Sequence, residues 1–211
     1  MRTIKKVASH IFIDGFGGMT QGLFATLIIG TMIQQIGLLI GGSTGNVIYL
    51  LGKAAAALTS AGIGVGVAVK YGESPLVTVS AAVAAMVGGY AGKITGGTFF
   101  VDGNAVLAGP GEPLGAFIAA FAGITCGHLV SGKTKVDIIV TPVITIGAGS
   151  VVGLLVGPPI SQMMTGLGSI INWATEQRPF IMGIVVSVVM GMVLTPVSYT
   201  HLRAHETCAD L

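Results

Sequence analysis

Long apolar runs alternate with short polar or glycine-rich connections along most of this chain. A helix needs about 20 mostly apolar residues to cross a bilayer. By that measure the pattern predicts about six spanning helices, at residues 15–40, 47–69, 75–91, 114–130, 136–157 and 179–195. The predicted fold class is therefore all-α, a polytopic transmembrane helical bundle.

One stretch interrupts this pattern, residues 92–113, with the sequence G-K-I-T-G-G-T-F-F-V-D-G-N-A-V-L-A-G-P-G-E-P. Its glycines and prolines break a helix, and Lys93, Asp102 and Glu112 bring charge into an otherwise apolar run. Irregular backbone is tolerated at membrane depth only under cover of protein or a water-filled cavity, and interrupted segments often mark a transporter's binding site. We predict a re-entrant or gate-like loop. The alternative is an ordinary extramembrane loop with a hydrophobic hairpin.

Two further features refine the predicted helices. The small-residue run at 54–64, A-A-A-A-L-T-S-A-G-I-G, predicts tight packing of the second helix against its neighbours. Pro158 and Pro159 predict a sharp end to the fifth helix. The mildly amphipathic residues 160–175 are then expected to lie at the membrane interface, with Trp173 as an anchor, or to dip part-way into the membrane.

Composition places the chain in the membrane. Of its 211 residues, 52% are hydrophobic and 9% are charged, against roughly 25% charged in soluble domains. The 34 glycines suit helices that approach one another closely. A net charge of +2 without a basic run argues against a nucleic-acid partner. The sequence shows no phosphate-binding G-x-x-x-x-G-K-[ST] motif and no metal-ligand cluster, so no cofactor and no metal are predicted.

Orientation follows from the lysines and arginines near the helix ends. With the N-terminus in the cytoplasm, six of these residues fall on the inner side and three on the outer side, which favours that orientation. The inner six are Arg2, Lys5, Lys6, Lys70, Lys133 and Lys135, and the outer three are Lys53, Lys93 and Arg178.

The last fourteen residues, 198–211, abruptly leave the apolar pattern and resemble the translated read-through of a sequencing adapter. We therefore divide the chain into a membrane domain at 1–197, expected to be truncated at its C-terminus, and a non-native tail at 198–211. On that interpretation His201 and His205 are not a pair of metal ligands, although their H-x-x-x-H spacing resembles one.

Glu112 is the strongest candidate for chemistry. It lies between Pro110 and Pro113, directly before a predicted helix start. An ionisable group near membrane depth is expensive to bury and therefore suggests function, and a carboxylate accepts hydrogen bonds from hydroxyl groups of a solute. The alternative is a solvated loop glutamate that caps the fourth helix.

Other polar residues have ordinary explanations beside functional ones. Asp102 and Asn104 are typical turn formers. Gln34 either faces a polar path or bonds across helices. His128 fits a packing histidine better than a proton relay, and Asp14 fits a helix N-cap.

Three stretches point to a known family. They are F-I-D-G-F-G-G-M-T-Q-G-L-F-A-T-L-I-I-G-T at 12–31, G-G-T-F-F-V-D-G-N-A-V-L-A-G-P-G-E-P-L-G-A-F at 96–117, and P-F-I-M-G-I-V-V-S-V-V-M-G-M-V-L-T-P at 179–196. These stretches resemble membrane subunit IIC of the bacterial phosphoenolpyruvate-dependent sugar phosphotransferase system. The closest likeness is to its perfringolysin-regulator-like branch.

The resemblance implies a permease subunit in the bacterial inner membrane that binds and translocates a sugar while a separate IIB subunit phosphorylates it. The G-x-x-E-P element of the glucose-type branch resembles residues 109–113 and implies a sugar-binding role for Glu112. Asn104 and Asp102 would shape the loop, and Gln34 and His128 are further binding candidates. Expected partners are the sugar, IIA and IIB subunits, membrane lipid and a second copy of the chain.

The chain lacks a IIB-like cysteine loop and a IIA-like histidine domain, so we expect no phosphorylation site of its own and at most a membrane component of a phosphotransferase complex. Two alternative functions stay open. One is a membrane-bound sensor that regulates gene expression, and the other is an ion-coupled carrier without phosphotransfer.

Overall fold

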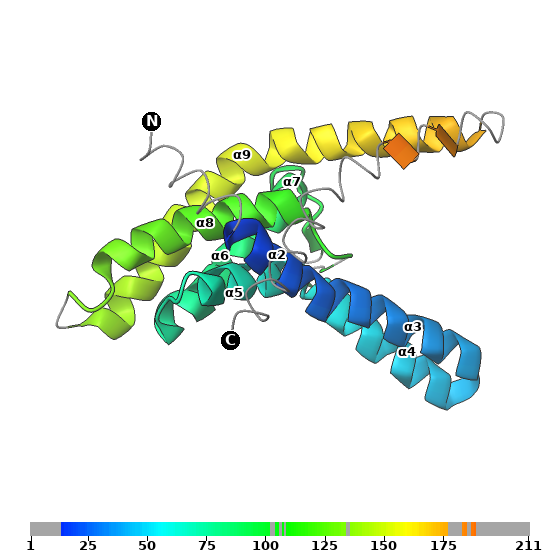
Figure 1. Cartoon of the computed structure of the whole chain (residues 1–211), viewed down its shortest axis with the longest axis horizontal. Helices are drawn as coiled ribbons and strands as arrows, with labels where there is room; N and C mark the ends of the chain where they lie inside the picture. The colour runs from blue at the N-terminus through cyan, green and yellow to red at the C-terminus, as the bar shows by residue number, and fades with distance from the viewer. Residues whose placement is uncertain are drawn as a thin grey trace, which may run out of the picture.

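The fold is described from a computed structural model of the chain (Figure 1). The described residues are 14–101, 104–105, 107, 109–133, 136–176, 183–184 and 187–188. They form helices, apart from one antiparallel ladder of two short strands. The structure thus confirms a helical membrane bundle.

The first predicted span is confirmed as one run from Phe16 to Ile40. It consists of α2 (Phe16–Leu23), the π-helical turn η2 (Phe24–Ile28) and α3 (Ile29–Ile40). The prediction that Asp14 caps this helix is wrong, because Gly15 occupies the N-cap position of α2. The backbone at Asp14 is already helical, so the residue lies within a helical turn and not at the start of one.

The second predicted span is broken. Helices α4 (Gly42–Ala57) and α5 (Thr59–Lys70) meet at Leu58 with a bend of 52°. The Thr59 hydroxyl donates to the Ala56 carbonyl at 2.7 Å and the Tyr90 hydroxyl donates to the Ala57 carbonyl at 3.2 Å. Side-chain hydroxyls therefore satisfy the carbonyls that the break releases, as a membrane interior requires.

Three elements and a ladder follow α5. Helix α6 (Pro75–Gly89) begins after Ser74, whose hydroxyl accepts from the Val77 N–H, and α7 (Ala91–Thr95) follows directly. Strands β1 (Phe100–Val101) and β2 (Asn104–Ala105) pair in register Phe100 to Ala105. Helix α8 (Pro113–Val130) confirms the fourth predicted span.

Helix α9 (Asp137–Glu176) continues through Pro158 and Pro159, so the predicted helix end there and the separate interfacial segment after it are both wrong. Proline's fixed φ is compatible with a helix, and its penalty is the lost hydrogen bond and the crowding of the preceding turn. Packing offsets that penalty here, because Gly153 lies against Gly88 of α6 and Gly157 lies against Ala91 of α7. The side chain of Trp173 lies outside the described residues.

Small residues let the helices approach closely, as their abundance predicted. A Cβ built on Gly18 of α2 would lie 2.5 Å from the Gly66 carbonyl oxygen of α5, and one on Gly88 of α6 would lie 2.5 Å from that of Gly115 in α8. The buried core is formed mainly by α5, α6 and α8, with the residues Ile63, Val67, Ala68, Val77, Ala81, Ala85, Ala116, Phe117, Ala120 and Ile124.

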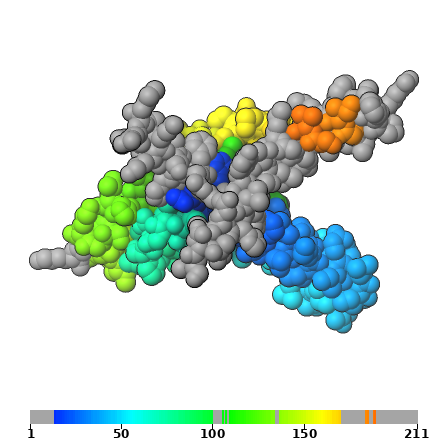
Figure 2. Space-filling model, viewed as in Figure 1, coloured from blue at the N-terminus to red at the C-terminus, as the bar shows by residue number. Residues whose placement is uncertain are grey.

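The α3–α4 pair extends away from this core as an arm, and the far end of α9 extends from it in another direction (Figure 1). Figure 2 shows the arm as a separate projection in blue and cyan. Large apolar side chains are exposed along it, including Leu39 at 86% and Leu38 at 62%. Apolar surface of this kind on a helix pair is what a lipid-facing element presents.

The described residues contain three helices long and apolar enough to cross a membrane, or up to four spans if the bent pair counts as one. They correspond to the first, fourth, fifth and second predictions. Helix α6, the third, has 15 residues, and at ~1.5 Å per residue it falls short of a core ~30 Å thick. Most of the sixth predicted span, 179–195, lies outside the described residues.

Candidate functional site

The end of the interrupted segment, residues 109–112, is fixed against the helical core by three hydrogen bonds. The Tyr90 hydroxyl donates to the Gly109 carbonyl, and the Ser60 hydroxyl donates to the Pro110 carbonyl at 2.9 Å. The Glu112 N–H donates to the Gly89 carbonyl at 2.7 Å. We call these four residues the seated loop. Its backbone is held at each residue but Gly111.

Gly111 fits this position for two reasons. Its φ of +75° is in the left-handed region, which glycine adopts without a Cβ penalty. A Cβ there would also lie 2.5 Å from the Ser60 Oγ and 3.1 Å from the Gly89 carbonyl oxygen. The loop can therefore approach α5 and α6 this closely only with glycine at position 111.

Tyr90 joins the seated loop to the break in the second span. Its side chain is buried, and its hydroxyl lies within hydrogen-bonding distance of carbonyls on both sides, Gly109 in the loop and Ala57 at the break. Ser60, two residues beyond the break, holds the loop from the same side. Two segments of irregular backbone, far apart in the sequence, thus meet at one place, which is the arrangement of binding sites between discontinuous helices.

Glu112 lines a hollow of about 390 Å³ beside the seated loop, together with Gly89, Gly92, Lys93, Gly109, Pro110, Gly111 and Ser161. Partial burial raises the pKa of the Glu112 carboxyl above its ordinary value of 4.5, and the Lys93 ammonium opposes that rise. The Lys93 Nζ lies 5.3 Å from the centre of the Tyr90 ring. The hollow therefore presents one carboxylate, one ammonium, a hydroxyl and several backbone groups.

The Glu112 side chain does not cap α8. Glu112 occupies the N-cap position, but its carboxyl makes no capping hydrogen bond to that helix. The capping alternative therefore does not describe this carboxyl, which faces the hollow half-buried. Its role in binding stays a prediction.

The other predicted site residues lie elsewhere. Asn104 belongs to β2 and pairs with Val101 through the backbone, and Asp102 lies outside the described residues. Gln34 is part of the α3–α4 arm, where its amide reaches the Gly30 carbonyl of its own helix at 3.4 Å. The structure does not bring Gln34 to the Glu112 hollow.

His128 lies near the opposite end of α8 from Glu112. Sixteen residues separate the two, which corresponds to ~24 Å along a helix at ~1.5 Å per residue. The His128 Nδ1 is 3.0 Å from the Glu73 Oε1, so the imidazole has a carboxylate partner of its own. In this conformation one small sugar does not contact both His128 and Glu112.

Sequence reasoning missed Ser60, Tyr90 and Ser161. In the sequence, Ser60 falls in the small-residue run at 54–64 and Tyr90 near the end of the predicted span at 75–91. A signal did exist, because hydroxyl side chains are sparse in these apolar stretches and Tyr90 follows a Gly-Gly pair. Which carbonyls those hydroxyls would meet depends on contacts between residues 50 and 19 positions apart.

The groups that line the hollow can hydrogen-bond to a polar solute. Among the described residues, no group of three or more His, Cys, Asp or Glu side chains is placed to hold a metal ion. A carboxylate and a hydroxyl facing one hollow accept and donate hydrogen bonds, as a polyhydroxylated ligand requires.

A family model described as "Phosphotransferase system, EIIC" matches residues 13–202 of the chain. No curated protein and no solved structure matches the chain. The family match covers most of the chain and includes the first five residues of the predicted tail, 198–202. The origin of that tail and the predicted branch within the family stay predictions.

Proposed function

Because this chain belongs to the EIIC family of the phosphotransferase system, we propose that it binds a sugar in the Glu112 hollow and carries it across the membrane. The family membership supports a membrane permease component of that system. Binding at Glu112 and the nature of the partner subunits are the parts that we add.

The observation that supports this site is the meeting of the seated loop with the break at Leu58. A binding site for alternating access needs backbone that can rearrange without unfolding a whole helix. A 52° bend at Leu58 and the positive φ of Gly109 and Gly111 provide such backbone on both sides of Tyr90. The Glu112 carboxylate beside it would accept hydrogen bonds from sugar hydroxyls and orient one of them.

Phosphorylation would then be the work of a separate IIB subunit, itself supplied by IIA. The chain's own contribution is to bind, orient and release the sugar. We place the protein in the bacterial inner membrane with its N-terminus in the cytoplasm, in contact with lipid and paired with a second copy. The orientation rests on the lysine and arginine distribution alone.

The test is sugar uptake by cells that express the complete gene with Glu112→Gln. The amide keeps the size of the side chain and removes its charge, so we expect uptake to be lost while the amount of protein in the membrane fraction is unchanged. Glu73→Gln is the matched control, because that carboxyl lies with His128 at the other end of α8. Unchanged uptake by Glu112→Gln would remove this residue from the site.

The same cells separate transport from the alternative functions. In a host that lacks the general phosphotransfer proteins, a phosphotransferase permease stops accumulating sugar phosphate, whereas an ion-coupled carrier continues to accumulate free sugar. A sensor would change transcription of neighbouring genes on sugar addition without any uptake. Either of those two results contradicts the proposed function.

A further inference from the structure

We propose a second sugar subsite between α7 and α9, joined to the Glu112 hollow, which makes the preferred substrate a neutral disaccharide. The inference rests on the proposed function, because it assumes that one sugar unit occupies the Glu112 hollow. It adds a place for the second unit and names the residues that hold it.

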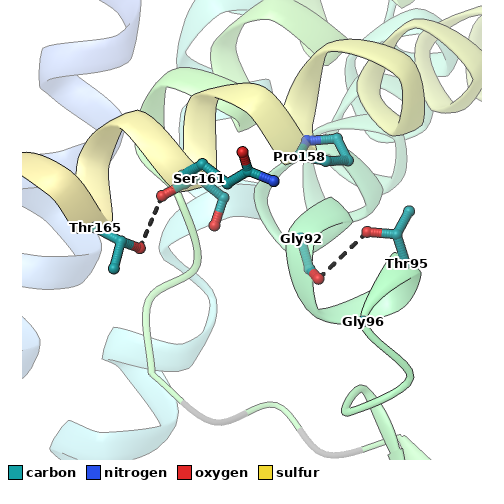
Figure 3. Close-up of a pocket in the computed structure, with 7 residues that line it drawn as sticks. Gly92, Thr95, Gly96, Pro158, Ser161 and Thr165 are labelled. Atoms are coloured by element: carbon teal, nitrogen blue, oxygen red, sulfur yellow. Dashed lines mark hydrogen bonds between the residues drawn. The ribbon is translucent and has the colours of Figure 1, made fainter.

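The subsite is a hollow of about 420 Å³ between α7 and α9 (Figure 3). In Figure 3, Ser161 and Thr165 of α9 lie across from Gly92 and Thr95 of α7. The hollow is lined by Gly92, Thr95, Gly96, Pro158, Ser161, Gln162 and Thr165. All of these residues are uncharged.

The lining presents hydrogen-bonding groups that the described protein leaves open. The Thr165 and Thr95 hydroxyls donate to backbone carbonyls of their own helices, at 2.8 Å to Ser161 and 2.9 Å to Ala91, so their oxygens remain able to accept. Within the described part of the chain, no hydrogen bond engages the Ser161 hydroxyl or the Gln162 amide. Together these groups can donate to and accept from the hydroxyls of a neutral ring.

Their place in a long apolar helix strengthens the inference. Ser161, Gln162 and Thr165 cluster within the apolar run Asp137–Ser169. Polar side chains inside a membrane segment usually face a partner helix or a polar cavity, because lipid cannot satisfy them. Here they face the hollow, so a polar occupant of that hollow explains why they are polar.

Gly92 and Ser161 line both hollows and therefore form the junction between them. A Cβ on Gly92 would lie 2.7 Å from the Ser161 Oγ, so the two residues are in close contact where the hollows meet and a larger residue at position 92 would displace Ser161. Each hollow lies near the lower end of the ~300–1,000 Å³ range of small-molecule pockets. Two such hollows in series accommodate two linked rings, one at Glu112 and one at Ser161.

The experiment measures uptake of radiolabelled maltose, cellobiose, lactose and sucrose, and of glucose, galactose and fructose, by cells that express the complete gene. We expect transport of at least one of the disaccharides. Gln162→Ala and Thr165→Ala, which alter residues that line only the second hollow, should each raise its half-saturating concentration about two- to tenfold, the effect of losing one neutral hydrogen bond. The half-saturating concentration of any transported monosaccharide should not change.

Ser169→Ala is the matched control, because it removes a hydroxyl from the same helix as Thr165→Ala does, but outside both hollows. Gly92→Ala should narrow the junction and reduce disaccharide uptake more than monosaccharide uptake. If that variant does not reach the membrane, the two polar variants still decide the question.

Three results would overturn the second subsite. They are transport of none of the four disaccharides, half-saturating concentrations that Gln162→Ala and Thr165→Ala leave unchanged, and an equal shift for monosaccharides and disaccharides. Glu112→Gln separates this failure from failure of the proposed function. If Glu112→Gln loses uptake while Gln162→Ala and Thr165→Ala are unaffected, the second subsite alone is removed. Intact uptake in Glu112→Gln removes the first site and the inference that rests on it.

Discussion

The two ends of α8 each carry an ionisable residue, yet they are built differently. At the N-terminal end, Glu112 lies in a loop whose backbone is bonded to Ser60, Gly89 and Tyr90. At the C-terminal end, the His128 imidazole is 71% exposed and contacts the Glu73 carboxylate beside an ordinary turn. Both residues were candidates from the sequence.

The difference shows what distinguishes the candidate binding site from an ordinary side-chain contact in this protein. At the other end, the His128 imidazole contacts the Glu73 carboxylate, and the Ser74 and Ser131 hydroxyls lie 3.1 Å apart. The imidazole itself is exposed, so its pairing with Glu73 should contribute little to stability. The Glu112 end joins irregular backbone from two parts of the chain around a hollow, and its carboxyl is not used by the helix that it precedes.

Gly111→Ala should have the largest effect of the variants that test this difference between the two ends of α8. The left-handed φ of +75° costs a non-glycine residue about 1 kcal/mol or more, and the added methyl group would also overlap Ser60. We expect uptake to fall at least tenfold and the thermal unfolding temperature to drop. Gly97→Ala is the control, because Gly97 also has a left-handed φ, +69°, but nothing lies within 4 Å of a Cβ there. That variant therefore measures backbone strain without steric overlap. Equal effects of the two variants would argue against a tightly seated loop.

Tyr90→Phe should have the next largest effect. It keeps the buried ring and removes the hydroxyl shared by the Gly109 and Ala57 carbonyls. Leaving buried carbonyls without a donor costs about 1–3 kcal/mol, measurable as reduced thermal stability in detergent and as weaker sugar uptake. Tyr49→Phe, on the arm, should change neither quantity. Full uptake by Tyr90→Phe would show that the loop and the break are not coupled through this hydroxyl.

The pH dependence of sugar affinity tests Glu112 more finely. Because burial raises the pKa of this carboxyl above 4.5, the group becomes protonated at a higher pH than a free glutamate. Affinity should therefore fall by about tenfold as pH decreases through the raised pKa, since a charged acceptor is replaced by a neutral one.

The contribution of Glu112 to folding stability should have the opposite pH dependence to the sugar affinity. A raised pKa in the folded state means that stability is fully present below 4.5 and is lost as pH rises through the folded value. Binding titrations and thermal unfolding across this range, with Glu112→Gln as the pH-independent reference, measure both trends. Affinity of the unmodified protein that stays constant with pH would exclude the carboxylate from sugar contact.

The smallest effect is expected for His128→Ala. Because the imidazole is exposed, its contact with Glu73 should contribute about 1 kcal/mol or less to stability, and we expect uptake within twofold of the unmodified protein. A double-mutant cycle with Glu73→Gln measures the pair directly. A large loss of uptake in His128→Ala would reverse the comparison and return this histidine to the list of site residues.

Much of the architecture followed from the amino-acid sequence alone. Long apolar runs specified the spans Phe16–Ile40 and Pro113–Val130, because only a helix satisfies its own backbone in lipid. The abundance of glycine indicated the close helix contacts. The charged, glycine- and proline-rich stretch 92–113 indicated where the regular pattern fails, and it placed Glu112 directly before a helix.

Only the tertiary structure decided the rest. Nothing local marks Leu58 as a break, since the carbonyls released there are satisfied by Thr59 nearby and by Tyr90, 33 residues from Ala57. Pro158 and Pro159 lie inside α9 because its glycines pack against α6 and α7, which outweighs a local preference to stop. Local sequence sets what each backbone segment prefers, whereas hydrogen bonds and packing from distant residues determine which preference the folded protein follows.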